Sequence, residues 1–130
     1  MSFFTQSARL VWFDGMAGLT AGVVVLMMSS WLAPWYDLPV SLLLFTGGMN
    51  LVYGSYSSTL ARRSTWRTPR TILALIAANA LWSVVCVTLV LVFFEQIHVF
   101  GAIHLLGEAC FVGGLAVWEW RWREALVDTT

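Results

Sequence analysis

Long runs of apolar residues alternate with short polar segments along the whole chain. A helix that crosses the ~30 Å hydrocarbon core of a bilayer needs about 20 apolar residues, at a rise of about 1.5 Å per residue. Four runs meet this requirement, with approximate bounds 10–32, 38–60, 71–94 and 99–118. The pattern predicts an all-α integral membrane protein in which residues 1–130 form one domain, a bundle of four transmembrane helices.

Prolines and polar residues mark the joints between these runs. Pro34 and Pro39 lie close together, and proline disfavours a helix interior, so we expect both neighbouring helices to stop outside the segment between them. Pro69 falls where the first turn of a helix tolerates a residue without a backbone N–H. The third joint, at Glu95-Gln96, carries a weaker signal.

Composition supports the membrane assignment. The chain is 59% hydrophobic and 11% charged, against about 45–50% and about 25% in soluble domains. Its mean hydropathy is +0.79. These values exclude a soluble enzyme, a nucleic-acid-binding protein and a disordered linker, and they make the lipid bilayer the first partner that we predict.

The basic residues are segregated along the chain, which contains no lysine. All the arginines precede the first run, occupy the loop 61–70, or follow the fourth run: Arg9, Arg62, Arg63, Arg67, Arg70, Arg121 and Arg123. The two other loops carry Asp37 and Glu95 and no basic residue. By the positive-inside rule, this predicts that both termini lie in the cytoplasm, with the protein in a bacterial cytoplasmic (inner) membrane.

Five polar or ionisable residues fall inside the predicted spans: Asp14, Asn50, Asn79, His104 and Glu108. Each shares a helical face with small or polar residues, so we expect them to face the bundle interior and to form a ligand or ion path. Ionisable residues at membrane depth are costly and often functional. Tyr53 and Trp82 are predicted to line a cavity around Glu108.

Alternative roles stay open for several of these residues. Asn50 and Asn79 can act as packing residues, because side-chain amides hydrogen-bond between membrane helices. Asp14 is near enough to the cytoplasmic surface to meet an arginine of the loop 61–70. Glu108 is near the midplane, and His104 precedes it by one helical turn, so the two side chains can hydrogen-bond. Such a pair can bind or pass a proton, contact a polar ligand, or simply stabilise the bundle.

No metal site, cofactor or catalytic motif is predicted. Glu95 and His98 form a single Glu-x-x-His, whereas a di-iron bundle needs two together with further carboxylates. Cys86 and Cys110 are interpreted as small apolar packing residues. The chain has no glycine-rich phosphate loop and no nucleophile elbow. The sequence therefore favours a non-enzymatic function over an enzymatic one.

The polar positions suggest a weak repeat of two parallel hairpins. Asp14 and Asn79 occupy the inner thirds of the first and third spans. Asn50 and Glu108 occupy the midpoints of the second and fourth.

Two short stretches resemble the small multidrug resistance transporters. Ala80-Leu81-Trp82-Ser83 and Phe93-Phe94-Glu95-Gln96 are similar to parts of that family's third helix and the turn that follows. The family has four spans and a carboxylate early in the first, which implies this role for Asp14. This chain has Asp rather than Glu there, and Val84 and Cys86 where the family has glycines.

Three functions are compatible with the sequence. A transporter or channel would need a homo-oligomer, because four helices barely enclose a pathway; the glycine faces of the first and fourth spans are candidate interfaces. A non-catalytic accessory or assembly subunit of a larger membrane complex is the alternative. The third is an intramembrane enzyme or a binder of a lipid-like ligand.

Overall fold

The computed structural model describes residues 3–127, with side chains described from Ala8 onward. This part of the chain is helical and contains no strand. Its elements are α1 (Phe3–Tyr36), α2 (Val40–Arg62), the short 3-10 helix η1 (Ser64–Trp66), α3 (Pro69–Val92), α4 (Val99–Arg121) and α5 (Arg123–Leu126). Three of the helices, α1, α3 and α4, are long and apolar enough to cross a membrane, which indicates a membrane protein.

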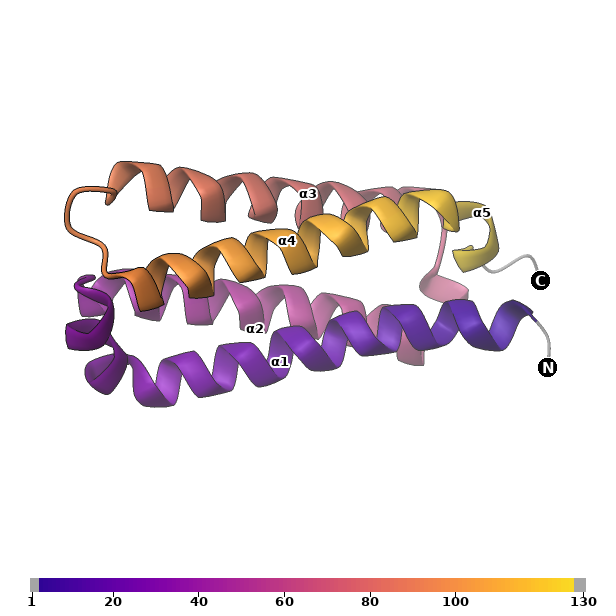
Figure 1. Ribbon diagram of the computed structural model, residues 1–130. Coiled ribbons are helices and arrows are strands. Elements are labelled where there is room, and N and C mark those ends of the chain that lie inside the picture. Colours follow the sequence, from indigo (N-terminus) through magenta and orange to yellow (C-terminus); the bar gives the residue numbers. More distant parts are fainter. Residues whose placement is uncertain (1–2, 128–130) are drawn as a thin grey trace.

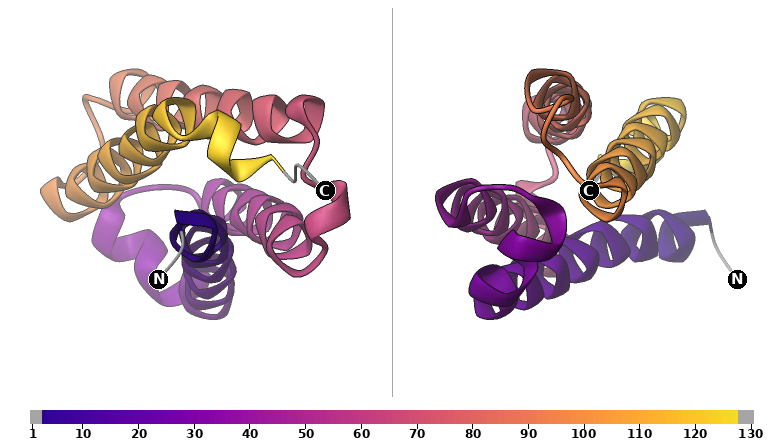
Figure 2. Two further views of the ribbon diagram at one scale, coloured as in Figure 1. Left: turned by 90° about the vertical axis from the view of Figure 1, so that its right-hand side faces the viewer. Right: turned by 60° about the vertical axis from the view of Figure 1, so that its left-hand side comes forward.

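The four long helices form two antiparallel hairpins (Figure 1). α1 packs mainly against α2, and α3 packs mainly against α4. Both views in Figure 2 show the α1–α2 hairpin on one side of the molecule and the α3–α4 hairpin on the other. The space between the hairpins is therefore bordered by all four helices.

Glycines allow α1 and α2 to approach closely. A Cβ added at Gly18 would lie 3.0 Å from the Cα of Gly54, and one added at Gly22 would lie 2.8 Å from the carbonyl oxygen of Gly47. Contacts this short require glycine, because the opposing atoms belong to the backbone. The glycine face of the first span is thus buried within the chain, and our expectation that it forms an interface between copies is wrong.

The first helix extends beyond its predicted end. Pro34 lies inside α1, which continues to Tyr36, so our expectation that both prolines exclude helix is wrong for Pro34. Pro34 is exposed, and the last part of α1 bends away from the axis of the rest of the helix (Figure 1). The backbone N–H of His98 donates to the Tyr36 carbonyl at 2.9 Å, which ties this end of α1 to the start of α4.

The other helix boundaries have clear local causes. Pro39 is the N-cap residue of α2, and Asp37 makes the turn before it with a φ of 50°, a left-handed conformation that aspartate tolerates. Thr68 caps α3 and forms a reciprocal capping box with Thr71, while Pro69 occupies the first turn as predicted. α4 continues to Arg121, beyond the predicted end at residue 118.

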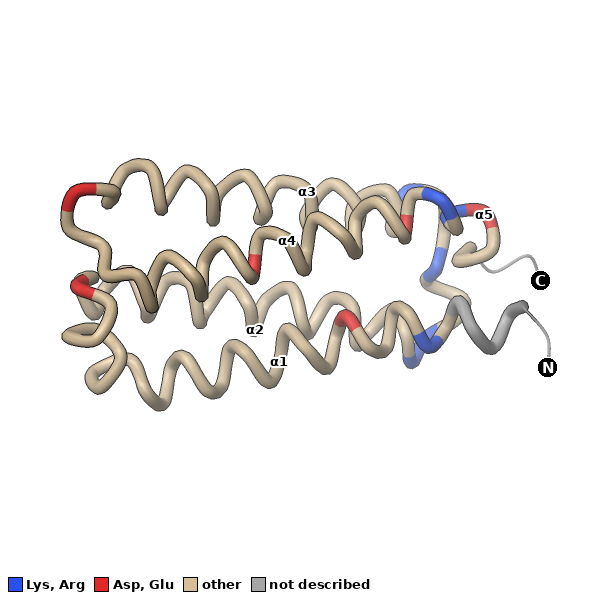
Figure 3. Tube along the Cα trace, viewed as in Figure 1, with Lys and Arg blue, Asp and Glu red and all other residues tan. Residues whose placement is uncertain are grey.

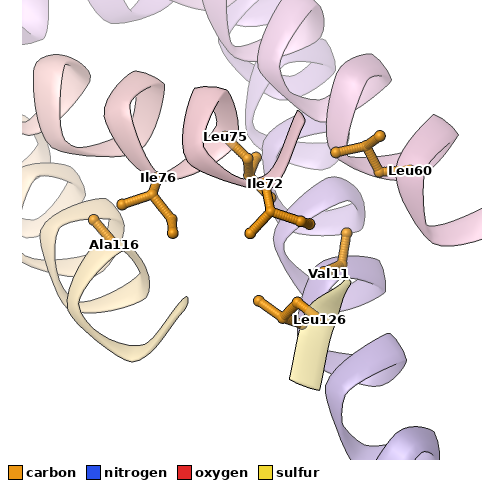
Figure 4. Packing of buried hydrophobic residues seen from close by; sticks show 7 residues of the cluster. All are labelled: Val11, Leu60, Ile72, Leu75, Ile76, Ala116 and Leu126. Carbon is orange, nitrogen blue, oxygen red and sulfur yellow. The ribbon is translucent and has the colours of Figure 1, made fainter. Parts of the chain in front are cut away.

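An apolar cluster closes the end of the bundle that contains the two chain termini. Its side chains come from α1 to α5: Val11, Leu60, Ile72, Leu75, Ile76, Ala116 and Leu126 (Figure 4). The arginines lie at this same end, whereas the two loops at the opposite end carry acidic residues (Figure 3). We call these the arginine end and the acidic end of the molecule.

Candidate functional site

A cavity of about 390 Å³ lies between the two hairpins. All seven residues that we predicted to form the path or line the cavity contribute to its wall: Asp14, Asn50, Tyr53, Asn79, Trp82, His104 and Glu108. The remaining lining residues are small or apolar: Ala17, Gly18, Ala21, Gly107, Phe111 and Val112. The structure therefore brings together candidates that lie on four different helices.

The carboxyl group of Glu108 is the centre of the first polar cluster in this cavity. Its Oε1 accepts hydrogen bonds from Asn50 Nδ2 and from Trp82 Nε1, both at 2.7 Å. Its Oε2 lies 3.5 Å from His104 Nε2, one helical turn away on α4. Glu108 is thus held from α2, from α3 and from its own helix, and its side chain is only 12% exposed.

Trp82 is fixed by packing as well as by this hydrogen bond. Its side chain is 2% exposed, and its ring packs against the rings of Phe45 and Tyr53, with centroids 6.0 and 5.7 Å away. A buried ring with these contacts has little rotational freedom. Its N–H therefore points at Glu108 at little further entropic cost.

Tyr36 extends this cluster toward the acidic end. The Tyr36 hydroxyl lies 2.8 Å from His104 Nδ1, and the two rings pack edge to face. Neutral His104 with its proton on Nε2 satisfies both contacts, because Nδ1 then accepts from Tyr36 and Nε2 donates to Glu108. Sequence reasoning missed Tyr36, because Pro34 suggested that the helix had already ended.

A second polar cluster lies at the arginine end of the cavity, where Asp14 and Asn79 form part of the cavity wall. Asp14 Oδ2 accepts from Ser57 Oγ at 2.8 Å and from Asn79 Nδ2 at 3.2 Å. Asn79 Nδ2 also donates to Glu119 Oε2 at 3.0 Å. Asp14 meets no arginine in the described part of the chain; Arg62 instead lies over the ring of Trp12. The alternative that Asp14 pairs with a basic residue of the loop is therefore wrong.

Glu119 is the main site residue that sequence reasoning missed. It is completely buried, although its neighbours Trp118 and Trp120 are exposed. A signal was present: Glu108 and Leu115 share one face of α4, and Glu119 is the next residue along that face, four positions after Leu115. The predicted fourth span ended at residue 118, so Glu119 fell just outside it.

In each cluster, two residues that occupy corresponding positions in the two hairpins of the weak repeat contact each other. Asp14 of α1 contacts Asn79 of α3, and Asn50 of α2 contacts Glu108 of α4. In each pair one residue is a carboxyl acceptor and the other an amide donor. Corresponding positions of the two hairpins thus meet across the cavity.

Within the described residues, no group of three or more His, Cys, Asp or Glu side chains could hold a metal ion. Cys86 is buried in the apolar core, whereas Cys110 is exposed. The cavity instead offers carboxyl and imidazole groups beside aromatic rings. This chemistry suits proton exchange and the binding of cations or hydrogen-bond donors.

The cavity wall has an opening at Gly107. This residue lines the cavity but is itself exposed, and a Cβ added there would meet no atom within 4 Å. At Gly113 of the same helix, by contrast, an added Cβ would lie 2.9 Å from the Ser83 hydroxyl oxygen, so that position is packed. The cavity is therefore accessible from the side of the bundle.

Comparison of the chain with protein-family models, with curated proteins and with solved structures finds no match. The chemistry of the cavity is therefore the basis for inferring function.

Proposed function

We propose that the protein spans the bacterial cytoplasmic membrane four times, with both termini in the cytoplasm. α2 has the same 23-residue length as α4 and lies beside α1 (Figure 1). Its lower hydropathy comes from glycine, serine and asparagine residues, several of which are buried against other helices. The clustering of arginines at one end supports the orientation, by the positive-inside rule (Figure 3).

We further propose that the cavity binds a small lipophilic cation, as the site of a membrane transporter or ligand carrier. The observation that carries this proposal is the wall of the cavity, which contains Asp14 and Glu108 but no arginine. Its volume of about 390 Å³ is within the range of small-molecule sites. An acidic, aromatic-lined cavity favours a cation over an anion.

Glu108 is the residue that we assign to the ligand's charged group. An ionised carboxylate offers about four acceptor positions. Asn50, Trp82 and His104 occupy three of them, which leaves one position open to the positive charge of a ligand. These partners also hold the carboxyl group in place before a ligand arrives, which lowers the entropic cost of binding.

The test is equilibrium dialysis of the detergent-solubilised protein with benzyltrimethylammonium and with its uncharged isostere, neopentylbenzene. We expect the cation to bind more tightly than the isostere, and Glu108→Gln to weaken cation binding at least about tenfold, or about 1.4 kcal/mol. Glu95→Gln is the matched control, because it removes one exposed carboxylate at the acidic end and leaves the cavity intact. Equal binding to the wild-type and Glu108→Gln proteins would contradict the cation site.

Native mass spectrometry of the protein, gently extracted from its own membrane, separates this function from the accessory-subunit alternative. A monomer or homo-oligomer agrees with an autonomous carrier. A fixed heteromeric mass would make the protein a subunit of a larger complex. If the carrier is oligomeric, the glycine face of α1 is not available as its interface, because α2 already covers it.

A further inference from the structure

The carboxyl groups of Asp14 and Glu119 form a pair that the cation site at Glu108 does not use. Both are buried, with exposed fractions of 6% for Asp14 and 0% for Glu119. They come from α1 and α4, and the amide nitrogen of Asn79 donates to both. One amide group therefore joins two acids from opposite hairpins.

The donors around the pair are too few for its acceptors. The two N–H bonds of the Asn79 amide are used by Asp14 and Glu119, and the Ser57 hydroxyl is used by Asp14. Glu119 Oε1 is fully buried and has no hydrogen-bond partner. A buried carboxylate oxygen without a donor is destabilising, because no hydrogen bond replaces the one lost from water. The cluster thus lacks one hydrogen.

No positive charge compensates the pair in the described part of the chain. The titratable groups that face it are Asp14 itself from α1 and Glu119 from α4, with Tyr53 of α2 and His104 and Glu108 of α4 further along the cavity. Ser57 of α2 and Asn79 of α3, which donate to the pair, do not titrate. The apolar cluster of Figure 4, with Leu126 of α5, lies at the arginine end.

The arginines at this end of the bundle lie away from the pair. Arg9 and Arg121, the nearest along the sequence, are exposed. Arg62 lies over the ring of Trp12, at 5.6 Å from its centroid, and Arg123 lies over Trp120 at 4.3 Å. Two neighbouring buried carboxylates without a cation are strongly unfavourable.

We propose that Asp14 and Glu119 share one proton and form a proton-binding site at the arginine end of the cavity. A proton on either carboxyl group removes one of the two charges and creates the missing O–H donor. Carboxyl pairs at short distance commonly hold a single proton in this way. A metal cation fits less well, because the amide and hydroxyl groups present their hydrogens, rather than their oxygens, to the shared site.

The test is infrared spectroscopy of the intact protein in lipid at neutral pH, observing the C=O stretch of protonated carboxyl groups. We expect this band in the wild-type protein. Asp14→Asn and Glu119→Gln should each abolish it, because the remaining carboxylate then has enough donors to stay ionised. Glu108→Gln and Glu124→Gln should retain it, the latter as a matched control at an exposed position five residues from Glu119.

Two outcomes would overturn the proposal directly: no protonated-carboxyl band in the wild-type protein, or a band that survives both substitutions in the pair. A third is a band that disappears when the potassium salt in the buffer is replaced by a sodium salt, because the pair would then be a site for a metal cation. The first and third need no variant, so the proposal remains testable even if Asp14→Asn or Glu119→Gln fails to fold. The measurement uses no ligand. Its result therefore does not depend on whether Glu108 binds a cation.

Discussion

The two buried glutamates of α4 differ in the hydrogen bonds that their carboxyl oxygens form. Glu108 has three partners on three helices, whereas Glu119 has one oxygen bound and the other without a partner. Both carboxyl oxygens of Glu108 therefore have a partner, whereas one carboxyl oxygen of Glu119 has none. This difference in donor supply leads us to assign ligand binding to Glu108 and proton binding to the pair containing Glu119.

The hydrogen bond between Tyr36 and His104 predicts a single histidine tautomer. In the wild-type protein we expect neutral His104 to carry its proton on Nε2, because Nδ1 accepts from the tyrosine hydroxyl. Tyr36→Phe removes that donor and keeps the ring, so the ring ¹⁵N NMR signals of His104 should shift toward those of a mixed tautomer population.

His98 is an internal control for this experiment. Its Nδ1 accepts from the backbone N–H of Phe100 at 3.3 Å, a contact that Tyr36→Phe leaves unchanged. The chain has only two histidines. Equal shifts at both, or none at His104, would contradict the assigned role of Tyr36.

The residues of the site were more predictable than their partners. Asp14 and Glu108 were identifiable because a carboxyl group within an apolar run is conspicuous and costly. Which residues they contact depends on the rotation of each helix about its axis. A membrane helix is apolar on all faces, so hydrophobic periodicity gives little information on that rotation. The Ser57 and Glu119 contacts could therefore not be derived from the sequence.

Helices of this protein use glycine for two different purposes. In α1 and α2, glycines remove side chains so that two backbones can touch. In α4, Gly107 instead leaves a gap in the cavity wall. The sequence places glycines on these helix faces, but it does not show whether a glycine lies at a contact between two helices or at an opening in the cavity wall.

The glycine contact between α1 and α2 predicts a position-specific loss of stability. Gly54→Ala would place a Cβ 2.9 Å from the Gly15 carbonyl oxygen and 2.9 Å from the Gly18 carbonyl carbon, and these backbone atoms cannot move cheaply. We expect the free energy of unfolding to fall by about 1–3 kcal/mol. Gly48→Ala, on the same helix, meets nothing within 4 Å and should leave stability unchanged or slightly raised. Denaturant titration in mixed micelles measures both.

The gap at Gly107 predicts that ligand entry can be blocked without destabilising the fold. Gly107→Leu adds a side chain where there is space, so the protein should remain stable while binding of benzyltrimethylammonium weakens about tenfold. Gly114→Leu is the matched control, since it is equally open, lies two turns along the same helix and does not line the cavity. If the two variants bind the probe equally well, entry does not occur at Gly107.

At the scale of the molecule, polarity is arranged in two directions. Along the bundle, arginines lie at one end and acidic loops at the other (Figure 3). Across it, each hairpin presents its polar residues to the cavity and most of its large apolar side chains outward; exposed examples are Met27, Leu91 and Ile103. The first arrangement was readable from the order of residues in the chain. The second required the packing of the hairpins.

The proposed orientation predicts opposite accessibility of the two ends. In a background with Cys86→Ala and Cys110→Ala, a cysteine introduced at Gln96 should react with a membrane-impermeant maleimide added to spheroplasts. One introduced at Ser64 should react only after the membrane is opened. The reverse pattern would invert the topology, and reaction of both in closed spheroplasts would contradict passage of the chain across the membrane between them.

The pairing of Asp14 with Asn79 and of Asn50 with Glu108 has a consequence for how such a protein can be encoded. Two identical hairpins related by a twofold axis would bring each residue next to its own copy, acid against acid and amide against amide. Joining two unlike hairpins in one polypeptide lets an acid face an amide at both levels. A gene for either hairpin alone could not produce this interior by homodimerisation, so the polar core requires two hairpins of different sequence.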